Sequence, residues 1–324
     1  MANSRIFIGI DLGGTKTAVS AGTEGGLILE KKAFPTDRDP ETALGNIFRE
    51  TEALIGRYRD GAAGITAQGA EAPGATARSV AALGVSCGGP LDSAKGIVQS
   101  PPNLPGWDNV PITAMLEQRF SLPAFIENDA NACALAEWYY GAGRGCKNMI
   151  FLTFGTGLGA GLILDGKLYR GAGGLAGELG HVRMSEDGPL GYGKRGSLEG
   201  WCSGAGLSAA YDDACGEKIP GGEVCARAER GDEKARAIIE QSALMLGRGL
   251  ALLIDLLNPD RIVIGSIFAR SEALFRAGVE KAIRSEALPP AAGACDILPA
   301  QLGEALGDTA AICAAANGLA AATR

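Results

Sequence analysis

Apolar positions near the start of the chain occur in short runs separated by glycine turns. Residues 6–10, 17–21 and 27–34 are rich in aliphatic side chains, which predicts three strands of an antiparallel meander. Apolar residues at helical spacing then predict a helix over 40–59. The glycine- and alanine-rich segment 60–79 is interpreted as a surface loop.

The next segments alternate between strand and helix patterns. "VAALGVSCGGPLD", residues 80–92, predicts a strand that ends in a glycine-proline turn, and residues 111–143 predict a helix, a buried strand, a polar turn and a second helix. Such alternation is typical of parallel strands.

"NMIFLTFGTGLGAGLILDGKLYRGAGG", residues 148–174, repeats the opening order of strand, glycine loop and strand. A repeated unit usually marks a duplicated half, so we expect two domains of one sheet topology. A helix over 234–257 ended by "NPD", a strand in "RIVIGSI" and an alanine-rich closing helix complete the prediction.

Composition narrows the class of protein. The 324 residues suffice for two domains, and a net charge of −7 without dense Lys or Arg clusters argues against a nucleic-acid partner. The first residues fit neither a signal peptide nor a membrane span, so we expect a cytoplasmic protein with no membrane partner. Eight widely spaced cysteines without a C-x-x-C pair are interpreted as reduced, mostly buried thiols.

Two glycine loops are candidates for binding phosphate. In "IGIDLGGTK", the residues Gly13, Gly14, Thr15 and Lys16 follow Asp11. Glycines let backbone amides approach a phosphate closely, and a carboxylate can hold Mg²⁺ or its waters. A plain hairpin with a glycine turn would explain the same residues. "FLTFGTGLGAG", residues 151–161, could act similarly, but neither loop has the G-K-[ST] of a Walker motif.

Asn128 and Asp129 in "ENDANA" follow a predicted buried strand. Open α/β sheets bind ligands at this end of their strands, where a carboxylate can accept the proton of a substrate hydroxyl. The alternative is that one of the two residues caps the following helix. Residues 177–200 raise a similar question, because they place His181, the only histidine, between Glu178 and Glu199 in a glycine-rich segment.

Seven segments together resemble the ROK sugar kinases (repressor, open reading frame, kinase), whose best-known enzymes are bacterial glucokinases. They are, in order, "DLGGTK", "GVSCGGPLD", "NLPGW", "ENDANACALAE", "TFGTGLGAGLILDGKL", "GELGHV" and "NPDRIVIG". The resemblance implies an α/β actin-like ATPase (ribonuclease H-like) fold, with two domains around a central cleft. We expect a smaller domain of residues 1–123 plus 300–324 and a larger one of 124–299.

The resemblance also implies an ATP- and Mg²⁺-dependent homodimeric kinase acting on a hexose or an N-acetylhexosamine, commonly at the 6-hydroxyl. Asp129 would be the general base, and Asp11 would hold Mg²⁺ through water. The sugar would contact Gly88, Asn103, Asn128, Asp129, Glu178, His181 and Glu199. ATP would contact Gly13, Gly14, Thr15, Lys16, Gly155, Thr156, Gly157 and Gly265.

One departure concerns zinc, which many ROK proteins bind through the histidine of "GHV" and three cysteines. Leu190, Tyr192 and Ser197 stand at the cysteine positions, while Gly193, Gly196 and Glu199 keep their spacing. We therefore expect no structural zinc. We predict instead a hydrophobic plug of Leu190 and Tyr192, with Ser197 making a local backbone hydrogen bond.

A second departure lies in "IVIGSIFAR", where the family usually has consecutive glycines against the adenosine. Ser266 and Ile267 follow Gly265, and isoleucine is unfavourable where the backbone needs a positive φ. Altered nucleotide binding or weakened ATP use is expected, which leaves a catalytically silent sugar sensor as an alternative. A transcriptional regulator of this family is disfavoured, because its DNA-binding domain would precede a phosphate loop that here begins by residue 11.

Overall fold

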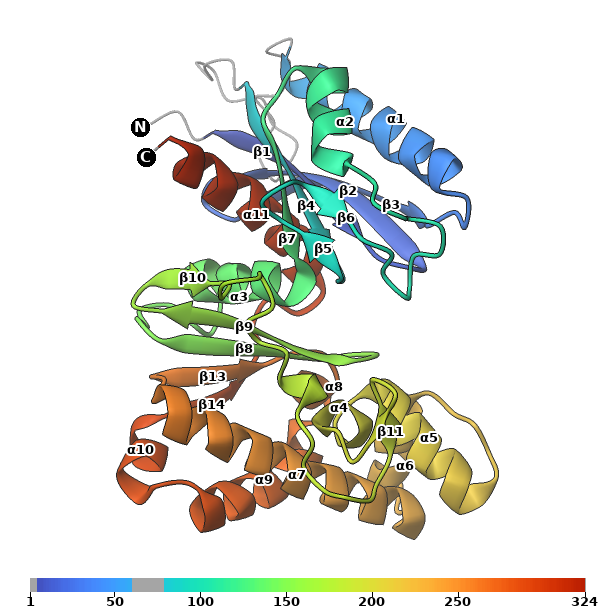
Figure 1. The fold of residues 1–324 in the computed structure, drawn as a ribbon, viewed down its shortest axis with the longest axis vertical. Helices are drawn as coiled ribbons and strands as arrows, with labels where there is room; N and C mark the ends of the chain where they lie inside the picture. The colour runs from blue at the N-terminus through green and yellow to red at the C-terminus, as the bar shows by residue number, and fades with distance from the viewer. Residues whose placement is uncertain (1–4, 60–78, 324) are drawn as a thin grey trace. The chain divides into compact units, whose positions relative to one another are not determined.

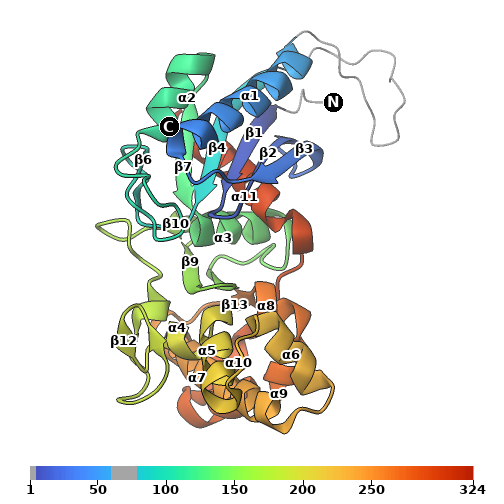
Figure 2. The same ribbon diagram turned by 90° about the vertical axis from the view of Figure 1, so that its right-hand side faces the viewer.

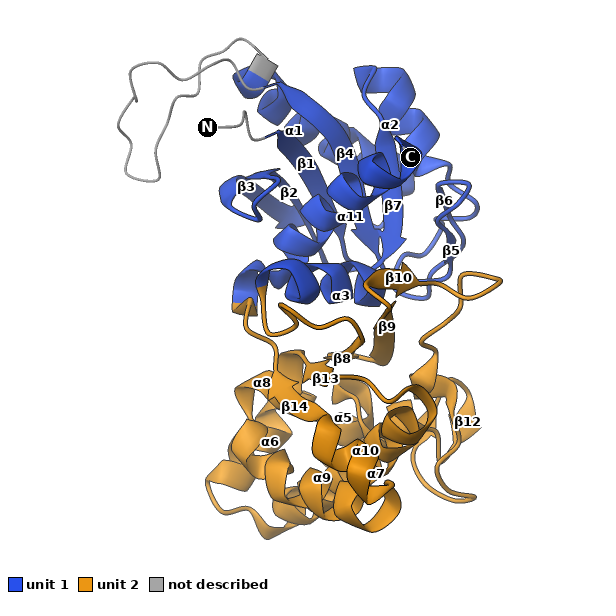
Figure 3. Cartoon of the chain, turned by 90° about the vertical axis from the view of Figure 1, so that its left-hand side faces the viewer, with its two compact units in different colours: residues 1–140, 304–324 blue, residues 141–303 orange. Residues whose placement is uncertain are grey.

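The computed structural model describes residues 5–59 and 79–323, so nearly all of the predicted loop over 60–79 lies outside the described residues. The chain forms two compact units (Figure 3). Unit 1 comprises Met1–Tyr140 and Glu304–Arg324, and unit 2 comprises Gly141–Gly303. The first boundary thus follows residue 140 and not residue 123, because the strand and helix after residue 123 pair and pack with the first sheet.

Unit 1 is built on a five-stranded mixed sheet (Figure 1). Its order is β3-β2-β1-β4-β7, where the strands are β1 (Ile6–Leu12), β2 (Lys16–Thr23), β3 (Ile28–Pro35), β4 (Val80–Cys87) and β7 (Ala124–Asn128). The first three strands form the predicted antiparallel meander. Strands β4 and β7 run parallel to β1, as the alternating pattern predicted.

Helices cover both faces of this sheet (Figures 1 and 2). Helices α1 (Pro40–Arg59) and α2 (Ile112–Phe120) cover one face, where Ile8 and Ile10 of β1 join a large apolar core. Phe7 points to the other face and packs with Ile312 of α11 (Leu306–Ala322), beside α3 (Asp129–Tyr140). Because side chains alternate along a strand, Asp11 lies on the same face as Phe7.

Glycines let α11 lie very close to the sheet. A Cβ atom on Gly9 would lie 2.8 Å from the side chain of Ala311, and one on Gly84 would clash with the Ala311 carbonyl oxygen and the Ala315 amide nitrogen. The alanine-rich sequence of α11 serves the same close contact. The last helix of the chain therefore completes the first unit.

Unit 2 repeats the sheet of unit 1. Its order is β10-β9-β8-β13-β14, where the strands are β8 (Met149–Phe154), β9 (Leu158–Leu164), β10 (Lys167–Tyr169), β13 (Arg261–Ile264) and β14 (Asp296–Pro299). An antiparallel meander is again extended by two parallel strands. The predicted duplication is confirmed.

The core of unit 2 lies between this sheet and a long helix pair, α7 (Glu233–Leu257) and α9 (Glu272–Glu286). Phe154 of β8 meets Phe275 of α9 edge to face, with ring centroids 5.4 Å apart. Helix α7 ends as "NPD" predicted, at Asn258 in a left-handed conformation. The remaining helices of the unit are α4 (Leu198–Trp201), α5 (Gly204–Cys215), α6 (Gly221–Glu229), α8 (Ser266–Arg270) and α10 (Pro289–Ala294).

Among the residues that the structure describes, two helical segments are long and apolar enough to cross a membrane by length and composition, Glu233–Leu257 and Gly303–Ala322. Their apolar windows are 61% and 44% buried inside the protein, and both helices pack in the cores described above.

Gly84→Ala is expected to destabilise unit 1 by about 3 kcal/mol, because α11 must move to admit the methyl group. Urea unfolding at constant temperature measures the change. The matched control is Gly45→Ala in α1, where no atom beyond the adjoining backbone of the same helix and the two chain neighbours lies within 4 Å of the new methyl group. Because alanine favours the helix, this control is expected to gain about 1 kcal/mol, and an equal effect of the two variants would refute the packing argument.

Candidate functional site

Asn128 and Asp129 stand where β7 passes into α3. The Asn128 side-chain oxygen accepts hydrogen bonds from the amides of Ala130 at 3.0 Å and Asn131 at 3.4 Å, so Asn128 caps α3. The capping interpretation is therefore confirmed for Asn128. Asp129 Oδ1 accepts from the Ala130 amide at 2.8 Å, which fixes the carboxylate at the end of the sheet.

Gly88, Asn103 and Asp129 converge at the carboxyl end of β4. A Cβ atom on Gly88 would lie 3.6 Å from Asn103 Nδ2 and 3.8 Å from Asp129 Oδ2. Residues far apart in the sequence thus surround one point, and the glycine leaves room beside the carboxylate. This is the ligand-binding end of the strands in open α/β sheets.

The Asp129 carboxyl keeps access to solvent at its surface. Protein atoms packed around it nevertheless disfavour the charged form and raise the pKa of Asp129, while the hydrogen bond from the Ala130 amide opposes this effect. A carboxylate with a raised pKa is a better proton acceptor than an ordinary surface aspartate.

Asp11 belongs to a group of acids on the α11 face of the first sheet. Burial, followed by the negative charges of Asp308 and Asp129, raises the pKa of Asp11 from 3.8 to about 6. Asp308 is buried in the first turn of α11 and forms an ion pair with Lys31 of β3. The Oδ1 atom of Asp308 has no hydrogen-bond partner among the described residues.

Sequence reasoning missed Asp308 and Lys31. An acid in the first turn of a helix is usually explained by the helix dipole, so "GDTAA" carried no separate signal. Only the packing of α11 beside β1 brings Asp308 to Asp11.

The first glycine loop, residues 13–15, is the turn of the β1–β2 hairpin. The Gly13 amide donates to the Lys16 carbonyl at 3.2 Å, and Thr36 Oγ1 donates to the Gly13 carbonyl at 2.6 Å. Gly14 packs against the backbone of Asn103 so closely that a side chain would clash. Close packing alone therefore explains why residue 14 is glycine, whether or not the loop binds phosphate. Thr15 and Lys16 are exposed.

The second glycine loop is the β8–β9 turn at Gly155, Thr156 and Gly157. The carbonyls of Gly155 and Thr156 accept hydrogen bonds from Gly204 and Ala205 at the start of α5, at 2.7 and 3.1 Å. The first residues of α5 therefore fix the backbone of this turn. The side chain of Thr156 is exposed.

Glu199 also holds the β8–β9 turn. Its Oε2 atom accepts a hydrogen bond from the Leu158 amide at 3.0 Å and lies 2.6 Å from the position of a Cβ on Gly157. The sequence predicted only a substrate contact for Glu199. The structure adds a positioning contact that ties α4 to the second glycine loop.

Glu178 and His181 flank a short 3₁₀ turn, η1 (Leu179–His181), and both side chains are exposed. The ring of Tyr192 stacks on the His181 ring with centroids 5.5 Å apart and an angle of 18°. Its hydroxyl donates to Glu178 Oε2 at 3.4 Å. Tyr192 therefore links the two predicted substrate residues.

The predicted hydrophobic plug is wrong. Leu190 and Tyr192 are 61% and 52% exposed, because they lie on a small hairpin of β11 (Leu190–Gly191) and β12 (Lys194–Arg195) whose turn projects Tyr192 outward. The prediction for Ser197 is confirmed: its buried hydroxyl donates to the Gly191 carbonyl at 3.0 Å and accepts from the Gly200 amide at 3.2 Å. Polar contacts, not a plug, order this part of the loop.

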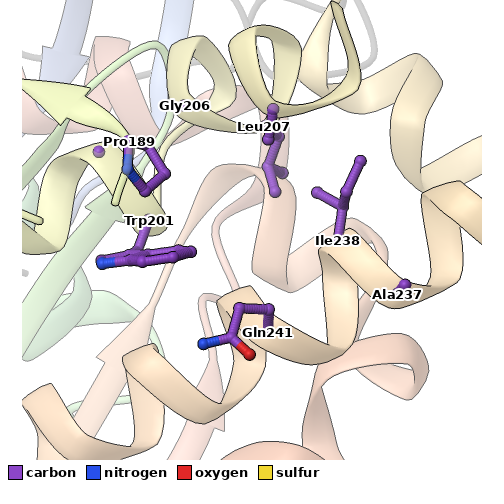
Figure 4. Close-up of a pocket in the computed structure, with 9 residues that line it drawn as sticks. Pro189, Trp201, Gly206, Leu207, Ala237, Ile238 and Gln241 are labelled. Carbon is purple, nitrogen blue, oxygen red and sulfur yellow. The ribbon is translucent and has the colours of Figure 1, made fainter. Parts of the chain in front are cut away.

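Trp201 anchors the rest of the loop. Its Nε1 donates to Ser185 Oγ at 3.1 Å, and its ring fills the space beside Gly188. The same ring lines an apolar pocket of about 230 Å³ with Pro189, Leu207 and Ile238 (Figure 4). None of the predicted site residues lines this pocket.

The predicted adenosine motif, residues 262–270, contains a backbone conformation that glycine usually adopts. Ser266 has a φ of +53°, while Ile267 lies inside α8 and is buried. The positive φ thus falls on serine and not on isoleucine. Gly265 lies against Phe151, whose Cζ would be 3.0 Å from an added Cβ.

Within residues 5–59 and 79–323, no three His, Cys, Asp or Glu side chains are grouped to ligate a metal directly. Cys202, the thiol nearest to His181 in the sequence, is fully buried and donates to the Ser242 carbonyl at 3.4 Å. Burial raises the pKa of the Cys202 thiol, as expected for a core cysteine.

The fold and these motifs match known proteins. The ROK family model matches residues 7–317. The glucokinase of Thermotoga maritima is 32% identical over 316 residues, which cover 93% of this chain and 94% of the relative.

Solved structures extend the match to the fold. The ROK hexokinase of Thermus thermophilus superposes with a TM-score of 0.82 at 29% identity, covering 98% of this chain and 99% of the other. A ROK family glucokinase from Streptomyces griseus, solved with glucose and AMPPNP, gives 0.75 at 31% identity, covering 97% and 100%. The fold is the actin-like ATPase fold, and the chain belongs to the ROK family.

Proposed function

We propose that the protein transfers the γ-phosphoryl group of ATP to a hydroxyl of a hexose or an N-acetylhexosamine. The proposed acceptor is the 6-hydroxyl. The observation that carries this proposal is the convergence of Asn103 and Asp129 Oδ2 beside Gly88. A carboxylate and an amide around an open position suit a substrate hydroxyl, which both donates and accepts hydrogen bonds. The named activities of the relatives support the same reaction.

In this reaction Asp129 takes the proton of the attacking hydroxyl. The hydroxyl oxygen forms a bond to the γ-phosphorus, the bond from that phosphorus to the β–γ bridging oxygen breaks, and ADP leaves. The raised pKa of Asp129 favours the proton transfer. Asn128, whose oxygen is used by its helix cap, would contact the sugar through its Nδ2 group.

Unit 2 would supply Glu178, His181 and Glu199 as further sugar contacts. Carboxylates and an imidazole match the alternating donors and acceptors of a sugar. Such a site rejects analogues that lack a hydroxyl, because its polar groups would then lose their partners.

The two glycine loops would bind the triphosphate. Both turns are held from outside by hydrogen bonds, while Thr15, Lys16 and Thr156 are exposed. Exposed side chains on a fixed turn can meet a phosphate with little ordering cost. Gly265 would lie against the adenosine.

Asp11 fits a role in holding Mg²⁺ through water. Burial and then two neighbouring acids raise its pKa, and buried Asp308 retains an oxygen without a hydrogen-bond partner among the described residues. Mg²⁺ usually keeps several waters and needs only one or two carboxylates besides phosphate. When bound, the ion neutralises charge that develops on the phosphates.

Asp129→Asn is expected to abolish phosphorylation, because asparagine cannot take the proton. Sugar affinity should stay within about tenfold, or about 1.4 kcal/mol. ADP release and sugar titration calorimetry measure the two quantities. Asp165→Asn, an exposed carboxylate in the β9–β10 turn, is the matched control and should keep wild-type turnover; turnover retained by Asp129→Asn would remove that residue from its role.

A coupled ADP-release screen with ATP and Mg²⁺ over hexoses and N-acetylhexosamines is expected to give turnover with one or a few sugars. The product's phosphate position, found by ³¹P NMR, tests the 6-hydroxyl. The alternative is a catalytically silent sugar sensor, for which the serine at the strained position 266 is the specific observation. Thermal stabilisation by a sugar without ADP release would favour the sensor.

Asp11→Asn is expected to raise stability at about pH 8 by about 2 kcal/mol and to leave it nearly unchanged near pH 4. The pKa of Asp11 is about 6 in the folded protein and 3.8 ordinarily, so the stability that its neutral form contributes is lost as pH rises through 6. Urea unfolding without metal checks this sign. Added Mg²⁺ should stabilise the wild type at pH 8 and the variant much less; a variant less stable than the wild type at pH 8 without metal would contradict the argument.

A further inference from the structure

Tyr192 occupies a backbone position that disfavours tyrosine. With Gly193 it forms the two-residue turn between β11 and β12, and the two φ angles are +52° and +68°. Such a type I′ turn favours asparagine or glycine at its first position. A side chain other than these costs about 1 kcal/mol or more, so its presence suggests a function outside the turn.

The side chain of Tyr192 has two contacts that explain its presence. Its ring stacks on His181, and its hydroxyl donates to Glu178 Oε2 at 3.4 Å. Gly180, between these two residues, lies against the ring edge, where a Cβ would be 3.3 Å from Tyr192 Cε2. The backbone of η1 is thus shaped to receive the tyrosine.

The hairpin that carries Tyr192 is itself fixed to α4. Ser197 Oγ donates to the Gly191 carbonyl, and Gly191 packs against the backbone of Gly200. Helix α4 also carries Glu199, whose carboxylate holds the Leu158 amide. Tyr192 therefore connects the exposed pair Glu178 and His181 to a hydrogen-bonded, closely packed part of unit 2.

We propose that Tyr192 is a positioning residue that holds Glu178 and His181 in the orientation that binds the hydroxyls of the sugar. This rests on the proposed function, in which these two residues contact the substrate. Exposed Glu and His side chains have several rotamers, and a ligand must otherwise order them on binding. Tyr192 restricts them before the substrate arrives.

The test compares three variants by kinetics. Tyr192→Asn suits the turn but removes both contacts, so the melting temperature should be unchanged or higher while KM for the sugar rises about tenfold and KM for ATP stays within about twofold. Tyr192→Phe keeps the ring and should raise KM for the sugar only about threefold. Leu190→Ala, an exposed residue of the same hairpin, is the control and should match the wild type.

His181 gives a readout that does not depend on activity. As the only histidine, it contributes a single Cε1–H imidazole signal to a ¹H–¹³C spectrum. The stacked ring should shift this signal upfield in the wild type and in Tyr192→Phe, and the signal should move to the position of free histidine in Tyr192→Asn.

The outcomes separate the two proposals. A displaced imidazole signal with an unchanged KM for the sugar would overturn the positioning role and leave the sugar kinase intact. An imidazole signal that does not move in Tyr192→Asn would overturn the contact itself. If the wild type neither binds nor phosphorylates any sugar, the proposed function fails, and the positioning role fails with it.

Discussion

The close contact between α11 and the first sheet is the constraint on which the rest of unit 1 depends. Because Gly9 and Gly84 have no side chains, the alanines of α11 can approach the backbone of β1 and β4 closely. This contact joins the end of the chain to its beginning. It also places Asp308 beside Asp11, so that burial and the negative charge of Asp308 together raise the pKa of Asp11. The close packing of α11 on the sheet is thus the reason why Asp11 has a raised pKa.

Unit 2 uses a different device to fix its polar residues. Hydrogen bonds from α4, α5 and the β11–β12 hairpin hold the β8–β9 turn and the Glu178–His181 pair from behind. Two of these contacts use side-chain groups, the Glu199 carboxylate and the Tyr192 hydroxyl, that sequence patterns assign to the substrate or to packing alone. One side chain can both bind a substrate and hold a neighbouring segment, because a carboxylate has two oxygens and a tyrosine has an apolar face and a polar hydroxyl.

The loop over 185–200 is ordered by hydrogen bonds and by one packed aromatic ring. The family resemblance implies zinc-binding cysteines at positions 190, 192 and 197, where this chain has leucine, tyrosine and serine, and we expected the two larger side chains to form a plug. The hairpin instead exposes both, and Ser197 and Trp201 hold the loop through hydrogen bonds and a packed indole ring. Ser197 could be predicted because capping is a local interaction. The exposure of Leu190 and Tyr192 could not be predicted, because the burial of a side chain depends on which other segments pack against it.

The sequence by itself determined the five strands of the first sheet, strands β8, β9 and β13 and helices α1, α2, α3, α7 and α11. It also determined the duplicated topology and the family, because periodicity, turn residues and motif order are local properties of the chain. It also identified Asn128 as a cap candidate. Only the tertiary structure decided the boundary after residue 140, the grouping of Asp308 with Asp11 and the contacts of Tyr192. Each of these depends on segments distant in sequence meeting in space, where distance and burial set the interaction, and no spacing along the chain encodes either.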